Sequence, residues 1–173
     1  MADNTLYFAY GSNINLNQME HRCPDASVVG PVFLDNYELL FRRGGFATIA
    51  PKEGERVHGL LWSLTPQCER SLDRYEGYPR FYDKRVVTVR DGEGRSLSVM
   101  AYIMDERFRE PMLPSNGYYN GILEGYRSSG LPVTALKKAW DHAVREVRQE
   151  TERINIEAAG RARPPKRRSD HER

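Results

Sequence analysis

Short apolar runs separated by turn residues fill the first two thirds of the chain. The first run, Leu6–Tyr10, is followed directly by Gly11-Ser12-Asn13, a pattern typical of a buried strand that enters a tight turn. Similar runs follow at Ser27–Leu34, Tyr37–Arg42, Phe46–Ala50 and Arg56–Ser63. Together they predict a series of strands.

Two later runs are the clearest local prediction. Tyr82–Arg90 and Ser96–Met104 are rich in apolar residues, and Asp91-Gly92-Glu93-Gly94 between them is a strong hairpin signal. Further upstream, Gly59 interrupts a strand pattern, which indicates a bulge or a close approach of another backbone segment.

Two short helices are expected among these strands. The first covers Asn15–Arg22, with Asn13 or Asn15 as the N-cap and with Leu16 and Met19 facing inward.

The second helix begins at Thr65-Pro66, because Thr is a good N-cap and Pro suits the first helical position. Its apolar residues recur at helical spacing, at Cys68, Leu72 and Tyr75. Gly77 suits the position after a helix and Pro79 prevents continuation, so Glu76 lies at or near the helix C-terminus.

The last third of the chain is predicted to be helical. One helix opens at Pro114-Ser115 and is broken by Gly130-Leu131-Pro132. Another begins at Val133, and its apolar stripe is formed by Leu136, Trp140, Ala143, Val144 and Val147. Gly160 and Pro164-Pro165 are expected to end regular structure.

Strands followed by helices favour an α+β fold rather than alternating α/β. The 173 residues suit one domain, which we place at residues 1–160, and we see no internal repeat. Residues 161–173 form an Arg-rich tail that we expect to be disordered.

The charge distribution argues against a nucleic-acid-binding body. The formal net charge is +2, but residues 161–173 hold six cations and two anions, which leaves the first 160 residues at −2. A partner-binding role for the basic tail is an alternative, although such charge runs are usually solvated extensions.

Familiar cofactor and compartment signals are missing from the sequence. Cys23 and Cys68 form no CxxC pair, the four histidines lack metal-ligand spacing, and no P-loop, dinucleotide fingerprint or GxSxG motif occurs. We therefore expect no metal and no cofactor. No signal peptide or membrane-spanning run is apparent, so a cytoplasmic protein without membrane contact is expected.

The segment from Tyr7 to Asn13 is the first candidate for chemistry. A strand that ends in Gly-Ser-Asn before a helix exposes backbone N–H groups, which can hold a carboxylate or a developing oxyanion. Taken alone, this segment fits an ordinary strand-to-helix turn better.

Glu76 is the second candidate. A carboxylate at a helix C-terminus meets the negative end of the helix dipole, and the neighbouring aromatic residues, Tyr75, Tyr78, Phe81 and Tyr82, can desolvate it. Both effects raise a carboxyl pKa toward neutrality, which suits a general base. Taken alone, Glu76 fits an exposed glutamate beside a helix stop better.

Three motifs in order resemble those of the γ-glutamylcyclotransferase-like proteins, and more specifically their amine-type and bacterial branches. The first is Tyr7-Phe8-Ala9-Tyr10-Gly11-Ser12-Asn13, and the second is Leu72-Asp73-x-Tyr75-Glu76-Gly77-x-Pro79-x-x-Tyr82. The third is Pro114-Ser115-x-x-Tyr118 with Gly125 and Gly130-Leu131-Pro132. The resemblance extends from residue 6 to about residue 150.

This resemblance implies a small mixed β-barrel with packed helices and a pocket for a γ-glutamyl group. The catalytic residue maps onto Glu76, and the substrate-binding residues map onto Tyr7, Phe8, Ala9, Tyr10, Gly11, Ser12, Asn13, Tyr82 and Tyr118. The loop is implied to act through its backbone groups. Either Lys84 or Arg85 fills the basic position of the motif.

The implied activity is cleavage of a γ-glutamyl amide by cyclisation to 5-oxoproline, with release of an amine or amino acid. Ring closure is intramolecular and needs no serine or cysteine nucleophile. The sequence does not identify the leaving amine or the oligomeric state. A binder of a γ-glutamyl-type or other small carboxylate ligand that performs no turnover is the alternative function.

Overall fold

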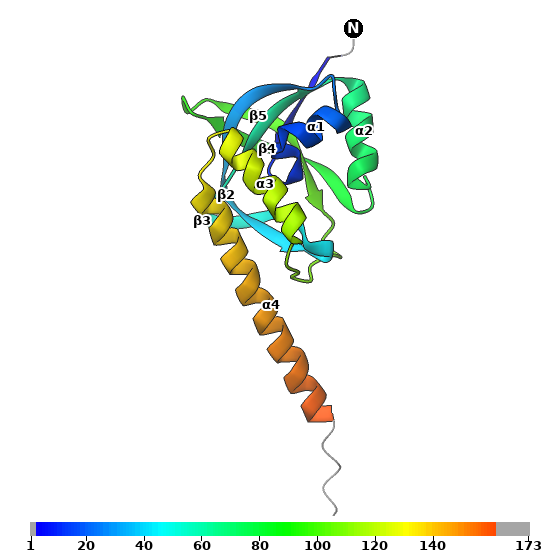
Figure 1. The fold of residues 1–173 in the computed structure, drawn as a ribbon, viewed down its shortest axis with the longest axis vertical. Coiled ribbons are helices and arrows are strands. Elements are labelled where there is room, and N and C mark those ends of the chain that lie inside the picture. The colour runs from blue at the N-terminus through cyan, green and yellow to red at the C-terminus, as the bar shows by residue number, and fades with distance from the viewer. Residues whose placement is uncertain (1–2, 162–173) are drawn as a thin grey trace, which may run out of the picture.

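A closed five-stranded barrel forms the centre of the molecule in a computed structural model, which describes residues 3–161 (Figure 1). The strands are β1 (Thr5–Ala9), β2 (Ser27–Arg42), β3 (Phe46–Leu64), β4 (Tyr82–Asp91) and β5 (Ser96–Met104). They lie in the order β1-β3-β2-β4-β5. The barrel is closed by a parallel pairing of β5 with β1, whereas the other neighbours are antiparallel. The expected small mixed barrel of an α+β fold is confirmed.

Two of the strands are longer than the sequence pattern predicted. Ser27–Leu34 and Tyr37–Arg42 are parts of one strand, β2, which pairs with β3 along most of its length. A register shift between Asp35 and Tyr37, where Asn36 has a φ of 61°, bends the strand without ending it. Phe46–Ala50 and Arg56–Ser63 are likewise joined in β3. The predicted hairpin of β4 and β5 is confirmed.

Four α-helices and two 3₁₀ turns surround the barrel in the described residues. They are η1 (Ser12–Ile14), α1 (Leu16–Arg22), η2 (Arg43–Gly45), α2 (Pro66–Glu76), α3 (Asn116–Ser128) and α4 (Val133–Arg161). Asn15, one of the two predicted caps of α1, and Thr65, the predicted cap of α2, accept hydrogen bonds from the first turns of these helices, and the side chain of Ser115 does the same for α3.

One predicted inward residue is wrong. Met19 is fully buried, but Leu16 at the start of α1 is 40% exposed. The helix is only seven residues long and packs on the body through the turn that holds Met19, which leaves its first residue in solvent.

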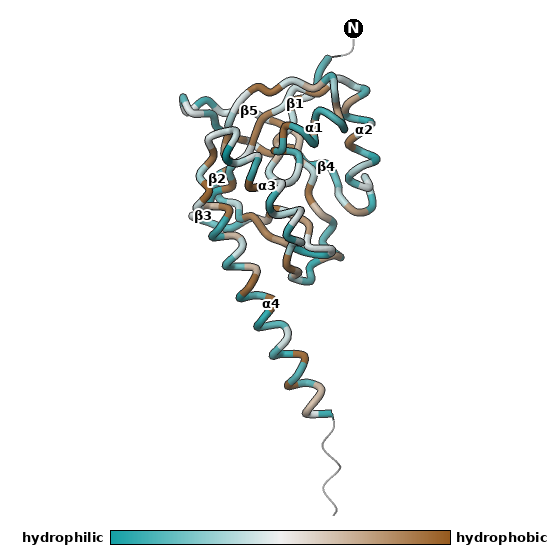
Figure 2. Tube along the Cα trace, in the orientation of Figure 1, coloured by the Kyte–Doolittle hydropathy of each residue, from teal (hydrophilic) through white to brown (hydrophobic). Residues whose placement is uncertain are grey.

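The core follows the alternation of the strands. Figure 2 shows apolar positions concentrated in the barrel, while the far part of α4 is largely polar. Gly59 of β3 confirms the predicted close approach, since a Cβ there would lie 2.3 Å from the carbonyl oxygen of Ala9 and 2.3 Å from the Phe8 ring. β1 and β3 therefore meet tightly just before the turn at Gly11.

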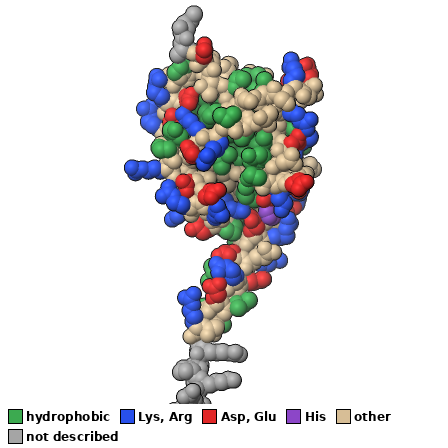
Figure 3. Space-filling model, turned by 180° about the vertical axis from the view of Figure 1, so that it is seen from behind, with side chains coloured by type: hydrophobic (Ala, Val, Ile, Leu, Met, Phe, Trp, Pro, Cys, Tyr) green, Lys and Arg blue, Asp and Glu red, His purple; other side chains and the backbone are tan. Residues whose placement is uncertain are grey.

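Helix α4 leaves the body and extends beyond it (Figure 1). Its first half packs on β2, where Arg42 forms a bidentate ion pair with Glu146 at 2.8 and 2.9 Å. The last part of the helix, residues 151–161, is exposed and carries charged side chains of both signs (Figure 3), together with the exposed Ile154 and Ile156. Gly160 does not end regular structure as predicted, because ion pairs such as Arg153–Glu157 support the helix through to Arg161. The rest of the predicted tail, 162–173, lies outside the described residues.

Candidate active site

A pocket of about 150 Å³ opens where β1, β3 and β4 meet the C-terminus of α2 and the first turn of α3. Its lining consists of Tyr7, Tyr10, Gly11, Ser12, Asn13, Phe46, Ala47, Tyr75, Glu76, Phe81, Tyr82, Tyr102 and Tyr118. Six of these residues are tyrosines, and none is Lys, Arg or His among the described lining residues. The only carboxylate in the lining is that of Glu76.

Most of the candidate site residues come together in this pocket. Glu76, Tyr82 and Tyr118 line it, as do five residues of the N-terminal motif, Tyr7, Tyr10, Gly11, Ser12 and Asn13. Phe8 and Ala9 do not line it. They lie in β1, and their side chains are fully buried in the core next to Gly59 of β3. The three motifs of the sequence thus meet in space through residues separated by up to 111 positions, from Tyr7 to Tyr118.

Asn13 is the polar centre of the loop that follows β1. Its side-chain nitrogen donates to Glu76 Oε1 at 3.0 Å and to the Tyr7 hydroxyl at 2.9 Å. Its backbone carbonyl accepts a hydrogen bond from Trp62 Nε1 at 3.0 Å. Asn13 is therefore held from both sides and presents its amide N–H groups toward the carboxylate of Glu76.

The backbone of the same loop offers free donors. Ser12 and Asn13 occupy the first positions of η1, whose N–H groups have no partner within the turn. Within residues 3–161, no hydrogen bond from the amide N–H of Ser12 or Asn13 is found. Both residues line the pocket, so these two amides are candidate donors to an oxygen bound there.

Glu76 is the last residue of α2, as the sequence predicted. Gly77 follows in the left-handed conformation with a φ of 65°, which glycine adopts without strain, and caps the helix. Burial raises the pKa of Glu76 to about 7, against the opposing effects of the Arg22 cation and the hydrogen bond from Asn13. A carboxyl group with a pKa near neutrality can accept and return a proton at physiological pH.

Arg22, at the end of α1, holds Asn13 in this orientation. Its NH1 donates to Asn13 Oδ1 at 2.7 Å and its NH2 donates to Gln18 Oε1 at 2.7 Å. The guanidinium carbon also lies 3.8 Å from the centre of the Tyr75 ring. Because Arg22 occupies the carbonyl oxygen of the Asn13 side chain, the amide nitrogen is the group left to face Glu76.

Two of the pocket tyrosines are tied to Ala47 in β3. The Tyr82 hydroxyl donates to the Ala47 carbonyl at 2.6 Å, and the Tyr118 hydroxyl accepts from the Ala47 amide at 3.0 Å. Burial raises the pKa of both tyrosines above its ordinary value, so both hydroxyls are protonated at neutral pH. The two hydroxyls are therefore neutral groups held in fixed positions in the pocket lining, and they do not serve as bases.

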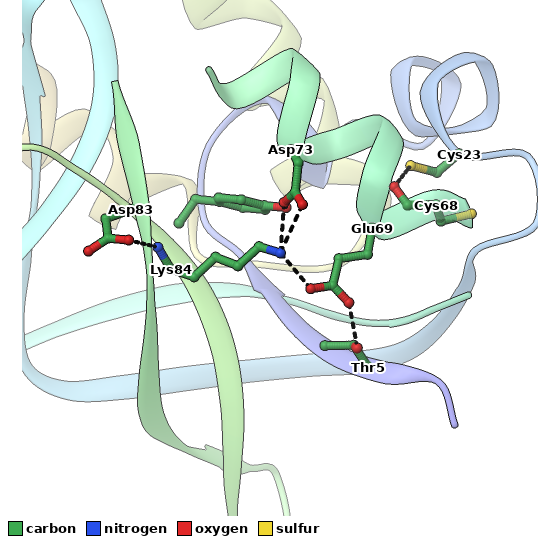
Figure 4. A network of polar contacts seen from close by, with 8 residues as sticks. Thr5, Cys23, Cys68, Glu69, Asp73, Asp83 and Lys84 are labelled. Carbon is green, nitrogen blue, oxygen red and sulfur yellow. Dashed lines mark hydrogen bonds and ion pairs between the residues drawn. The ribbon is translucent and has the colours of Figure 1, made fainter. Parts of the chain in front are cut away.

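A second polar network anchors α2 to β4 and β5 (Figure 4). Lys84 Nζ lies 2.6 Å from Glu69 Oε1 and 2.8 Å from Asp73 Oδ1. The Tyr102 hydroxyl donates to Asp73 at 2.6 Å, and the Thr5 hydroxyl donates to Glu69 at 2.7 Å. Lys84, rather than Arg85, is therefore the basic residue that contacts α2, whereas Arg85 is exposed and pairs with Asp83.

Sequence reasoning missed several residues of the site. Phe46, Ala47 and Tyr102 line the pocket from strands, and Arg22 supports it from α1. Tyr75 and Phe81 were recognised only as neighbours that desolvate Glu76, and both line the pocket. The double glycine before Phe46 is a local signal that could have directed attention there, whereas Arg22 and Tyr102 carry no local signal.

The described residues contain no group of three or more His, Cys, Asp or Glu side chains arranged to hold a metal ion. None of the helices in this part of the chain combines the length and apolar character that a bilayer-spanning segment needs.

Comparison with known proteins places the chain in a family. The family model described as "Gamma-glutamyl cyclotransferase, AIG2-like" matches residues 7–121. The chain is 33% identical to a gamma-glutamylcyclotransferase of Bos taurus and 31% identical to that of Homo sapiens, each over 144 residues that cover 77% of this chain and 76% of the relative. A solved structure named "Gamma-glutamyl cyclotransferase" superposes with a TM-score of 0.72 at 30% identity, covering 79% of this chain and 86% of that chain.

The matched region contains the N-terminal motif, Glu76 and Tyr118, and the pocket brings together Glu76, Tyr118 and five of the seven motif residues. The family resemblance of the sequence is confirmed, and the chain belongs to the gamma-glutamyl cyclotransferase, AIG2-like family of enzymes, which cyclise γ-glutamyl compounds.

Proposed function

We propose that this enzyme cleaves a γ-glutamyl amide by attack of the substrate's own α-amine on its γ-carbonyl, with Glu76 as the general base and acid. The observation that supports the proposal is the position of Glu76, whose carboxyl has a pKa of about 7 and faces the pocket beside two free backbone amides. The products are 5-oxoproline and the free amine or amino acid.

The reaction begins with a proton transfer. The α-nitrogen is an ammonium at neutral pH and cannot attack until it loses a proton, which the Glu76 carboxylate accepts. The resulting amine closes a five-membered ring on the γ-carbonyl carbon. Because nucleophile and electrophile belong to one molecule, the entropic cost of bringing them together is small, and no protein nucleophile is needed.

The oxyanion of the tetrahedral intermediate is assigned to the amide N–H groups of Ser12 and Asn13. Preorganised backbone donors of this kind stabilise charge that develops in the transition state. Collapse of the intermediate breaks the bond between the γ-carbon and the departing nitrogen. The ring nitrogen gives up two protons in all and the departing nitrogen gains both, so Glu76 returns to its carboxylate form.

The test is release of 5-oxoproline from purified protein incubated with γ-glutamyl-alanine, γ-glutamyl-ε-lysine and a γ-glutamyl alkylamine. We expect 5-oxoproline from at least one amide, and the preferred amide identifies the leaving group. If a γ-glutamyl amide binds to the protein but none yields 5-oxoproline, the proposal is wrong and the binder without turnover is favoured.

A further inference from the structure

The solvent end of the pocket has an aromatic character that the proposed chemistry does not require. Of the described residues that line the pocket, Phe46 and Tyr75 are the two most exposed, with 41% and 46% of their surface accessible. The remaining lining residues are buried or half-buried. These two rings therefore form the rim at which the pocket opens to water.

Both rings are held in place by neighbours. Phe46 packs edge-on against Tyr118 and Phe81, with ring centres 5.4 and 6.1 Å away. It follows Gly45, which has a φ of 74° and at which a Cβ would lie 2.4 Å from the Leu113 carbonyl oxygen. Only glycine fits there, so the backbone before Phe46 is fixed against the segment that precedes α3.

Tyr75 is held from the other side of the site. Its ring faces the Arg22 guanidinium at 3.8 Å, and its hydroxyl lies 3.2 Å from Ser12 Oγ. Tyr75 is thus contacted both on the face of its ring and at its hydroxyl, whereas an exposed tyrosine with no role usually lacks such contacts. Contacts with neighbouring side chains thus hold both rings in position before any substrate binds, which reduces the entropic cost of binding.

The position of Glu76 determines which part of a substrate reaches this rim. The reacting carbonyl and α-amine must lie at the inner end, close to Glu76 and the loop amides of Ser12 and Asn13. The cavity of about 150 Å³ is well below the roughly 300–1,000 Å³ of pockets that bury drug-sized ligands. Whatever the departing nitrogen carries therefore extends outward between the rim residues.

The chemistry of the rim favours an apolar group. No Lys, Arg or His lines the described pocket, and the guanidinium of Arg22 is already engaged by Asn13, Gln18 and Tyr75. A leaving group with an additional carboxylate would find no cation in the pocket lining, and at Tyr75 it would meet only the guanidinium of Arg22, which already donates to Asn13 and Gln18. An aromatic or branched aliphatic side chain would instead bury apolar surface against two preorganised rings.

Resting on the proposed cyclisation, we propose that Phe46 and Tyr75 form the leaving-group subsite, and that the preferred substrates are γ-glutamyl amides whose departing amine carries an apolar or aromatic side chain. Phe46 and Tyr75 are then specificity-determining residues, and Glu76 performs the same proton transfers for every substrate.

The experiment compares kcat/KM for γ-glutamyl-phenylalanine, γ-glutamyl-leucine, γ-glutamyl-alanine and γ-glutamyl-glutamate, with 5-oxoproline as the common product. We expect phenylalanine and leucine to exceed alanine by about tenfold, and glutamate to fall below alanine. In Phe46→Ala and in Tyr75→Ala the phenylalanine-to-alanine ratio should fall by about threefold or more. Using a ratio cancels effects on the shared glutamyl group.

Two further variants serve as controls. Tyr75→Phe keeps the ring and should keep the ratio, and Val86→Ala, which changes a 78% exposed residue of β4 outside the pocket, should change neither rate. A ratio near one in the wild type, or a ratio that both alanine variants leave unchanged, overturns the subsite. In that result 5-oxoproline is still released, so the proposed function survives. Absence of 5-oxoproline from every substrate would instead overturn both proposals.

Discussion

Helix α2 presents carboxylates to two regions that differ sharply. On the side that packs against β4 and β5, Glu69 and Asp73 share the ammonium of Lys84 at 2.6 and 2.8 Å. At the C-terminal end, the one hydrogen bond to the Glu76 carboxylate within residues 3–161 comes from the neutral side-chain amide of Asn13, at 3.0 Å. In the first region the carboxylates are paired with an ammonium group. In the second, the carboxylate of Glu76 lies in a pocket whose lining contains no cation.

The pKa shifts follow this difference. Burial acts to raise the pKa of Glu69, but the bonds from Lys84 and Thr5 outweigh it and hold that pKa below its usual value. Burial likewise raises the pKa of Glu76, and the weaker opposition of Arg22 and Asn13 leaves it at about 7. The same residue type on one helix is thus an anchor in one place and, in the proposed mechanism, a proton carrier in the other.

The most direct test of the difference between the two regions is to make the same substitution at Glu76 and at Glu69. Glu76→Gln removes the proton acceptor and should lower kcat by about 10²–10⁴-fold, the usual contribution of a general base. Glu69→Gln is the matched control and should keep kcat within about threefold, because Glu69 lies outside the pocket. Steady-state release of 5-oxoproline measures both, and near-wild-type turnover by Glu76→Gln would contradict the mechanism.

Substitutions in the region where Lys84 pairs with Glu69 and Asp73 should change the free energy of unfolding rather than the rate of the reaction. Lys84→Met leaves Glu69 and Asp73 partly buried without their cation and should lower the free energy of unfolding by about 1–3 kcal/mol. Arg85→Met is the matched control on the same strand, where an exposed pair at 3.3 Å should be worth less than about 1 kcal/mol. Urea denaturation gives both values, and equal losses would show that the Lys84 network is no anchor.

Substitution of Arg22 tests what sets the pKa of Glu76 in the pocket. Its cation opposes the raised pKa of Glu76, so Arg22→Met should raise that pKa further. Catalysis needs the carboxylate form, so the acid limb of kcat/KM should move to higher pH, by about half a unit or more. Arg22→Lys keeps the charge and should return the limb toward its wild-type position. A limb that stays in place in Arg22→Met would exclude this electrostatic role.

Ser12→Ala should have the smallest effect. Its hydroxyl lies 3.2 Å from the Tyr75 hydroxyl and 3.3 Å from Arg22, whereas its proposed role uses the backbone N–H, which the variant keeps. Loss of these two long hydrogen bonds should lower kcat/KM by less than about tenfold. Complete loss of activity in a variant whose circular dichroism matches the wild type would point to a nucleophilic serine instead.

The parts of the molecule that the sequence predicted well are those with local signals. The strand before Gly11 was predicted correctly, and the cap at Thr65 and the stop at Gly77 predicted where Glu76 lies, because each signal depends on neighbouring residues only. The same holds for the hairpin of β4 and β5.

The parts that the sequence did not predict depend on distant contacts. Arg22 meets Asn13 and Tyr75 only because α1 and α2 pack together, and Tyr102 reaches the pocket only because β5 closes the barrel beside β1. The bend at Asn36 was read as a strand end, because a bulge and a turn use the same residue types. Location in the cytoplasm stays a prediction.

The most direct test of the account is to titrate Glu76 itself. The side-chain carboxyl carbon of ¹³C-labelled glutamate, assigned by comparison with Glu76→Gln, reports the protonation of this one group by NMR. We predict a titration midpoint at about 7 that coincides with the acid limb of kcat/KM. A midpoint near the ordinary value of 4.5, with the acid limb elsewhere, would contradict the assignment of Glu76 as the proton-transferring residue.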